Sequence, residues 1–169
     1  MSVVINGTGS ISGLSNVGGI SSAQSGSIIQ TVNATYATQT TNASTSVYAN
    51  TGLTASITPQ FATSKILVLV NHNGNIVIGN AGGGAIRFKL QRNGSDITFI
   101  DGMTSYISVS SNSGSATCST AYLDSPATTS STAYSTQFMV RNSGTAYVQY
   151  NDGTGYQAVS TITLMEIAG

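Results

Sequence analysis

The amino-acid sequence predicts an all-β fold, a jelly-roll-like antiparallel β-sandwich preceded by an extended N-terminal arm. The first reason is composition: 26 serines, 23 threonines and 19 glycines among 169 residues, with two prolines, favour strands and tight turns over helices. The second is spacing, because short apolar segments recur at intervals of about ten residues from Ile28 onward, separated by turn-forming residues. The third is length, which suffices for one domain with a core.

Residues 1–27 differ from the rest of the chain in how their apolar residues are distributed. Their apolar side chains stand singly among glycine, serine and asparagine, and they supply too little bulk for an independent core. We therefore expect an arm that orders by docking on another surface, and a β-sandwich domain over residues 28–169. The predicted docking residues of the arm are Val4, Ile11, Leu14, Val17 and Ile20.

The middle of the chain contains the most apolar stretch. Residues 64–70, SKILVLV, form a continuous apolar run, which predicts a central strand covered on both faces. The polar stretch NHNGN follows directly and predicts a turn that contains His72.

Two local patterns make the sharpest structural predictions. In AIRFKLQR, alternation places Ile86, Phe88 and Leu90 toward the core, with the two basic residues between them on the opposite face. The pair Asn93-Gly94 predicts a tight hairpin, because a type I′ turn needs positive φ at both central residues. With the remaining apolar segments, about ten or eleven strands and no convincing helix favour a jelly roll. Those segments lie in residues 27–38, 44–59, 76–80, 95–100, 103–110, 115–124, 131–141, 145–151 and 159–168.

Charge and cysteine content argue against several classes of function. Five basic and five acidic residues are scattered along the chain and sum to zero, which argues against binding to nucleic acid or to an anionic membrane. The single cysteine, Cys118, excludes a disulfide framework and a multi-cysteine metal site, and we expect it to be a small core residue. No signal peptide is visible, and no apolar run is long enough to span a bilayer.

No group of residues predicts catalysis. The only histidine, His72, lies in the predicted polar turn, where we expect it to be exposed. The stretches DGMTS and NDGTG lack the alternating oxygen ligands of an EF-hand, and the GNAGGGA cluster lacks the lysine of a phosphate-binding loop. We therefore predict a protein that is not an enzyme, with no catalytic residue, no metal and no cofactor. The eight tyrosines leave carbohydrate binding open, beside a simpler role in closing the ends of the core.

Several stretches resemble structural proteins of tailed bacteriophages, especially cyanophages and other aquatic phages. They are VVINGTGSISGLSNVGG, GSIIQTVNATYATQT, TGLTASITP, TSKILVLV and STITLMEIA, and together they extend from residue 3 to residue 168. The resemblance implies a β-rich module behind a Gly/Ser-rich leader, found in capsid decoration proteins and at the ends of tail fibres and tailspikes, and commonly trimeric. It implies no shared catalytic residue.

We expect a capsid decoration, or cement, protein, because a tail fibre normally has an attachment part, a stalk and a tip, whereas this chain shows a leader and one module. The expected partners are two further copies in a homotrimer and the major capsid protein, on the exterior of a virion whose proteins are made in the host cytoplasm. The alternative is a short tail-fibre or tailspike-like receptor-binding subunit, whose partners would be other tail proteins or a host-surface glycan.

The C-terminal strand supplies the predicted trimer interface. Alternation places Ile162, Leu164 and Glu166 on one side of it, and both sides carry apolar residues. We therefore expect the strand to be covered on both sides, by its own core and by a sister subunit or an opposite loop. A covered Glu166 needs a hydrogen-bonded or ion-paired partner. The candidate cations are Lys65, Arg87, Lys89 and Arg141.

Overall fold

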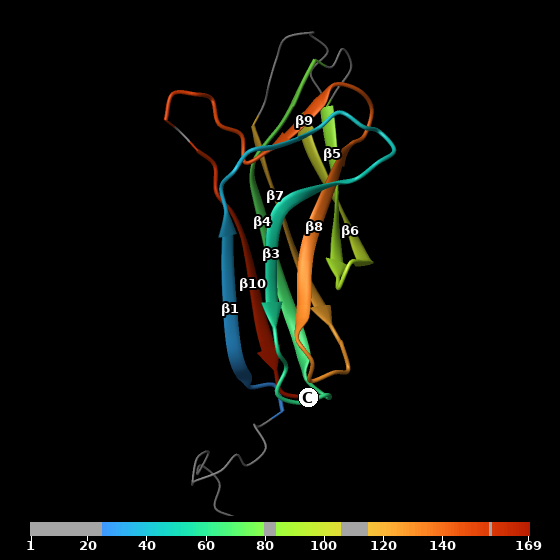
Figure 1. Cartoon of the computed structure of the whole chain (residues 1–169), viewed down its shortest axis with the longest axis vertical. Helices are drawn as coiled ribbons and strands as arrows, with labels where there is room; N and C mark the ends of the chain where they lie inside the picture. The colour runs from blue at the N-terminus through green and yellow to red at the C-terminus, as the bar shows by residue number, and fades with distance from the viewer. Residues whose placement is uncertain (1–24, 80–83, 106–114, 156) are drawn as a thin grey trace, which may run out of the picture.

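The structure, a computed structural model, describes residues 25–79, 84–105, 115–155 and 157–169, with the backbone alone at residues 84 and 101–105. Within these ranges the chain forms ten strands and no helix, arranged as two antiparallel sheets that face each other (Figure 1). The all-β prediction is therefore confirmed.

The first sheet has β4 at its centre. β10 pairs with one edge of β4 and β7 with the other, and β1 pairs with the far edge of β10. The short strands β9 and β2 extend this sheet beyond the point where β10 leaves β4. The bounds are β1 Ile28–Tyr36, β2 Thr40–Asn42, β4 Lys65–Ile78, β7 Ala116–Asp124, β9 Thr145–Val148 and β10 Ser160–Ile167.

The second sheet has the order β3-β8-β5-β6. Its strands are β3 Ala49–Ile57, β5 Gly84–Arg92, β6 Ser95–Ser105 and β8 Thr132–Val140. Leaving aside β2 and β9, the eight long strands pair first with last, second with second-last, and so on inward: β1 with β10, β3 with β8, β4 with β7 and β5 with β6. This nested pairing, closed by β10–β4 and β8–β5, is the topology of a jelly roll.

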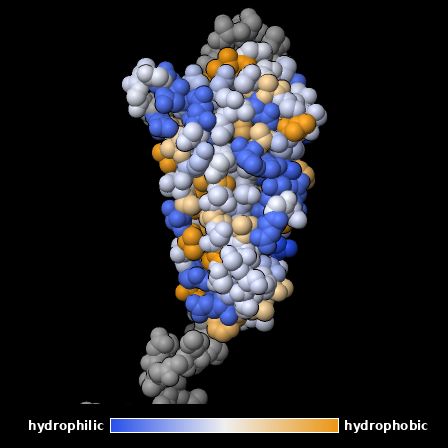
Figure 2. Space-filling model, in the orientation of Figure 1, coloured by the Kyte–Doolittle hydropathy of each residue, from blue (hydrophilic) through white to orange (hydrophobic). Residues whose placement is uncertain are grey.

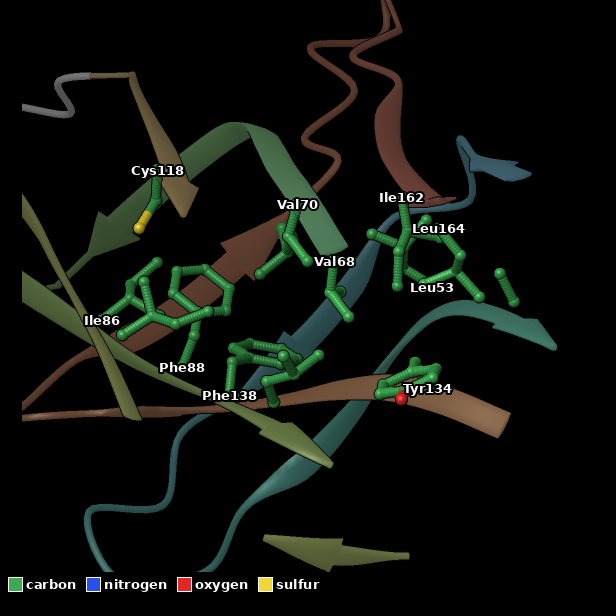
Figure 3. Packing of buried hydrophobic residues seen from close by; sticks show 14 of the residues in the cluster. Leu53, Val68, Val70, Ile86, Phe88, Cys118, Tyr134, Phe138, Ile162 and Leu164 are labelled. Carbon is green, nitrogen blue, oxygen red and sulfur yellow. The ribbon is translucent and has the colours of Figure 1, made fainter. Parts of the chain in front are cut away.

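The core lies between the two sheets and is built from alternate residues of each strand. Phe88 and Phe138 of the second sheet meet Val68 and Val70 of the first, as Figure 3 shows. Ile86, Phe88 and Leu90 are at most 1% exposed, which confirms the alternation predicted for β5. The Asn93-Gly94 hairpin is also confirmed, since these residues have φ of 49° and 81°.

Two predictions about β4 are wrong. The stretch NHNGN is not a turn: β4 runs through it, with a bulge between His72 and Asn75 and φ of 64° at Gly74. A bulge uses the same asparagine and glycine chemistry as a turn, but the strand continues beyond it. Among the described residues of a single chain, the strand is covered on one face only, because Leu67 and Leu69 are half-buried on the outer side of the sheet while Ile66, Val68 and Val70 fill the core.

Candidate assembly surface

The chain enters the sandwich beside its own C-terminal end. The backbone N–H of Gly26 donates to the carbonyl of Ala168 at 2.8 Å, and the N–H of Ala168 donates to the carbonyl of Ser27 at 2.9 Å. The first strand of the sheet, β1, begins at Ile28, directly after this pair of hydrogen bonds. The predicted docking residues of the arm, Val4, Ile11, Leu14, Val17 and Ile20, lie outside the described residues.

The predicted trimer-interface residues lie in the core of the single chain. Ile162, Leu164 and Glu166 each have no exposed surface, because this side of β10 faces the second sheet. Side chains that fill the core of their own chain are not available to a sister subunit, so this assignment is corrected. The other side of the same strand, with Thr161, Thr163 and Met165, faces outward.

Glu166 holds the connection between β3 and β4. Its carboxylate accepts hydrogen bonds from Gln30 Nε2 at 2.5 Å, from the backbone N–H of Gln60 at 2.7 Å and from that of Phe61 at 3.4 Å. Burial on its own raises the pKa of Glu166, but the hydrogen bonds from Gln30 and from the backbone outweigh burial and leave the pKa below its usual value. The expected partner is thus a set of hydrogen-bond donors within the chain, and no ion pair to Glu166 occurs in the part of the chain that the structure describes.

The outer side of the first sheet presents a regular array of side chains. Three rows cross the four long strands in the order β1, β10, β4, β7, and every member of each row is exposed or half-buried. We call these twelve residues the outer face of the first sheet. The rows are Thr31, Met165, Leu67, Leu123; Asn33, Thr163, Leu69, Ala121; and Thr35, Thr161, Asn71, Ser119.

This outer face carries no ionisable side chain. Its amide and hydroxyl groups bond to one another: Asn33 Nδ2 donates to Thr163 Oγ1 at 2.8 Å, and Ser119 Oγ donates to Asn71 Oδ1 at 3.0 Å. A shallow hollow of about 540 Å³ lies over β4, β7 and β10. Such a surface has no general acid, base or nucleophile with an activating partner, but it can pack against another uncharged surface.

The outer side of the second sheet has a different chemistry. Lys89 Nζ lies 3.0 Å from an Asp96 carboxylate oxygen and 4.5 Å from the centre of the Tyr48 ring. Hydrogen bonds from Gln91 and from Lys89 hold the pKa of Asp96 below its usual range. Phe99 stands beside Lys89 on β6 and is 67% exposed. In Figure 2 hydrophilic residues gather toward the side where β6 lies, and hydrophobic residues form scattered spots.

His72 is a core residue, which corrects its expected exposure. The ring is fully buried and stacks on Phe88, with 4.4 Å between ring centroids and 9° between planes. Neither ring nitrogen has a hydrogen-bond partner among the described residues, and burial lowers the pKa to about 3. The ring is therefore neutral at physiological pH. His72 faces Cys118 across β4 and β7 and lies before the bulge, in phase with Val68 and Val70. Extending the predicted strand by two residues beyond Val70 would have placed this histidine in the core.

A polar cluster that alternation alone did not predict joins the two sheets at one edge. Arg92 Nη1 of β5 lies 2.9 Å from both carboxylate oxygens of Asp124 on β7, and the hydroxyl of Tyr134 on β8 donates to Asp124 at 2.6 Å. Burial and the neighbouring carboxylate raise the pKa of Tyr134, so its hydroxyl keeps its proton. The cluster fastens the sheets together. Across the described residues, no group of three or more His, Cys, Asp or Glu side chains could hold a metal ion.

Comparison with known proteins finds no matching family model and no matching curated protein. Among solved structures, the crystal structure of dimeric latent PorU from Porphyromonas gingivalis is similar to 86% of this chain, with 13% identity and a TM-score of 0.30. The chain spans 14% of the length of that protein, and a likeness of this degree carries no argument about function. Within the described ranges, no helix has the length and apolarity needed to cross a bilayer.

Proposed function

We propose that this protein is a non-enzymatic structural protein of a tailed-bacteriophage virion, a trimeric capsid decoration protein that stabilises the outer capsid surface. The sequence stretches that resemble phage structural proteins support the virion. The observation that carries an assembly role is the uncharged outer face of the first sheet, a broad surface suited to protein contact and without catalytic groups. The partners in this proposal are other copies of the chain and the major capsid protein.

The proposed mechanism is contact rather than chemistry. Decoration proteins placed across junctions between capsid subunits add buried area, and that area opposes the outward pressure of packaged DNA. The jelly roll supplies a rigid body, because its two sheets are joined by a continuous core and by the Arg92–Asp124–Tyr134 cluster. Residues 1–27 would bind the capsid through their isolated apolar side chains.

The test is decoration of empty capsids by purified protein, with and without its N-terminal segment. The deletion should remove residues 1–24 and keep Gly26 and Ser27, whose hydrogen bonds with Ala168 close the end of the sandwich. We expect the shortened protein to fold with the same strand content by circular dichroism and to lose capsid binding. Full-length protein that fails to bind capsids, or labels only the tails of intact virions, would refute the cement role. Normal decoration by the shortened protein would refute a docking role for residues 1–24.

A second candidate function rests on the outer side of the second sheet. Phe99, Lys89, Gln137 and Asn50 lie side by side across four strands, and Gln137 Nε2 donates to Asn50 Oδ1 at 2.7 Å. An exposed aromatic ring beside amide side chains suits contact with a saccharide, as a receptor-binding tail subunit needs. Binding of purified protein to host cells or to their lipopolysaccharide, lost in Phe99→Ala, would favour this alternative over the capsid role.

A further inference from the structure

We infer that the outer face of the first sheet is the surface through which copies of this chain contact one another. The inference rests on the proposed function in one respect: it gives the expected homo-oligomer a location. It also replaces the assignment to Ile162, Leu164 and Glu166 with the opposite side of β10. The occupant of the face is a second copy of this chain.

The charges on the two sheets decide which outer side can meet copies of itself. When copies of one chain meet through the same region, a charged side chain near the centre of that region approaches its own copies, and like charges repel. None of the twelve residues of the outer face is ionisable, and Lys65, at the end of β4, lies outside its three rows. The outer side of the second sheet holds Arg87, Lys89 and Asp96 at comparable positions. The first sheet is therefore the one whose face can meet its copies without charge repulsion.

The large apolar side chains of the outer face lie together. Leu67 lies opposite Met165 on one neighbouring strand and opposite Leu123 on the other, and Leu69 is the next outward residue along β4. The four side chains thus form one contiguous cluster, and Leu123 is 49% exposed. Isolated surface leucines are common, but a contiguous cluster on a sheet indicates a contact surface.

Polar side chains surround this apolar cluster, and several of them bond to one another. Asn33 bonds to Thr163, and Ser119 bonds to Asn71, so four of the seven polar side chains of the face already have a partner within it. Amide and hydroxyl groups that already have partners within the face lose less free energy when a second copy excludes water from them. Covering these four side chains with a second copy therefore costs less than covering unpaired ones.

The size of the face predicts how strong the contact is. Strands lie about 4.8 Å apart and rise about 3.3 Å per residue, and the rows are two residues apart, so three rows across four strands cover roughly 400 Å² of flat area. Stable interfaces bury about 800 Å² of accessible surface on each partner. We therefore expect association through this face to be weak and to depend on protein concentration in the micromolar range or above.

The test compares two single lysine substitutions in the full chain by sedimentation velocity over a series of concentrations. Leu123→Lys places a charge in the apolar cluster, and the side chain is exposed enough for the fold to tolerate it. Ser56→Lys is the matched control, because Ser56 is exposed on β3 of the second sheet. We expect the wild-type protein and Ser56→Lys to associate alike, and Leu123→Lys to associate at least about tenfold more weakly. Ala121→Lys, on the same face, supplies a second variant if Leu123→Lys does not fold.

Three results would overturn the inference: a wild-type protein that stays monomeric at all concentrations, an unchanged association of both face variants, or an equal loss in Ser56→Lys. Capsid binding is measured separately on the same proteins. If Leu123→Lys loses association and none of the proteins binds capsids, the contact face is supported and the decoration role is refuted. If the wild-type protein binds capsids but never self-associates, the decoration role is supported and the contact face is refuted.

Discussion

Replacing His72 with leucine should make the fold less sensitive to acid. The ring is fully buried against Phe88, and neither nitrogen has a partner among the described residues, so the folded protein resists protonation until the pH approaches its pKa of about 3. In the unfolded chain the same ring takes up a proton near its ordinary pKa of 6.5. Below pH 6.5 the unfolded state therefore binds more protons, and the free energy of unfolding falls as the pH decreases.

The size of the effect follows from the two pKa values. Between the two values each pH unit removes about 1.4 kcal/mol, so at a pH of about 4.5 His72 lowers the free energy of unfolding by about 2.7 kcal/mol relative to neutral pH. The whole free energy of unfolding of a small domain is about 5–15 kcal/mol, so this loss is a large part of it. At neutral pH, His72→Leu loses the ring stacking of about 0.5–1.5 kcal/mol and removes two unpaired polar atoms, so we expect a change within about 2 kcal/mol in either direction.

The assay is urea unfolding of wild-type and His72→Leu proteins at pH 7 and at a pH of about 4.5, at one protein concentration. Carboxylates such as Glu166 titrate equally in both proteins. Comparing how much the free energy of unfolding of each protein falls between the two pH values therefore isolates the contribution of His72. We expect the variant to gain about 2.7 kcal/mol over the wild type on acidification. A gain below about 0.5 kcal/mol would refute the reasoning. So would a histidine NMR resonance that titrates near pH 6.5, which can be assigned directly because the chain has a single histidine.

Three further substitutions test the internal contacts, each by the midpoint of urea unfolding. Gly52→Ala should lower the free energy of unfolding by about 2–4 kcal/mol, because φ is 84° and a Cβ would collide with the ring of Tyr36; a loss below about 1 kcal/mol would show that the ring moves freely. Glu166→Gln should lower the free energy of unfolding by about 1–3 kcal/mol at neutral pH, because it weakens the hydrogen bonds to the carboxylate. The lowered pKa of Glu166 means that its charged form stabilises the fold, so the difference from wild type should shrink as the pH falls below the ordinary carboxyl pKa. A difference that is constant with pH would contradict this. Tyr134→Phe should lower the free energy of unfolding by about 1.5–3 kcal/mol, because its hydroxyl bonds to the charged Asp124, and an unchanged midpoint would mean that this hydrogen bond adds nothing.

Prediction from sequence worked where the signal is local. The alternation in β5 and the Asn93-Gly94 turn depend on residues close together in the chain, and the structure confirms both. The bulge at Gly74 has the sequence pattern of a turn, because both use glycine at positive φ. The two differ only in whether the strand keeps its partners on either side, which depends on distant strands. The partners of Glu166 come from Gln30, 136 positions away, and from the loop after β3, so no pattern near residue 166 could have identified them.

The sequence by itself determined the all-β class and, away from the bulges, which residues share a face of a strand, because a period of two is set by the local geometry of the backbone. Only the tertiary structure decided which of the two faces of β10 is buried. That choice depends on which side the second sheet covers, and therefore on the pairing of strands that are distant in the chain. It moved the candidate contact surface from Glu166 to the side of Thr163 and Met165, where twelve side chains from four strands form one uncharged array.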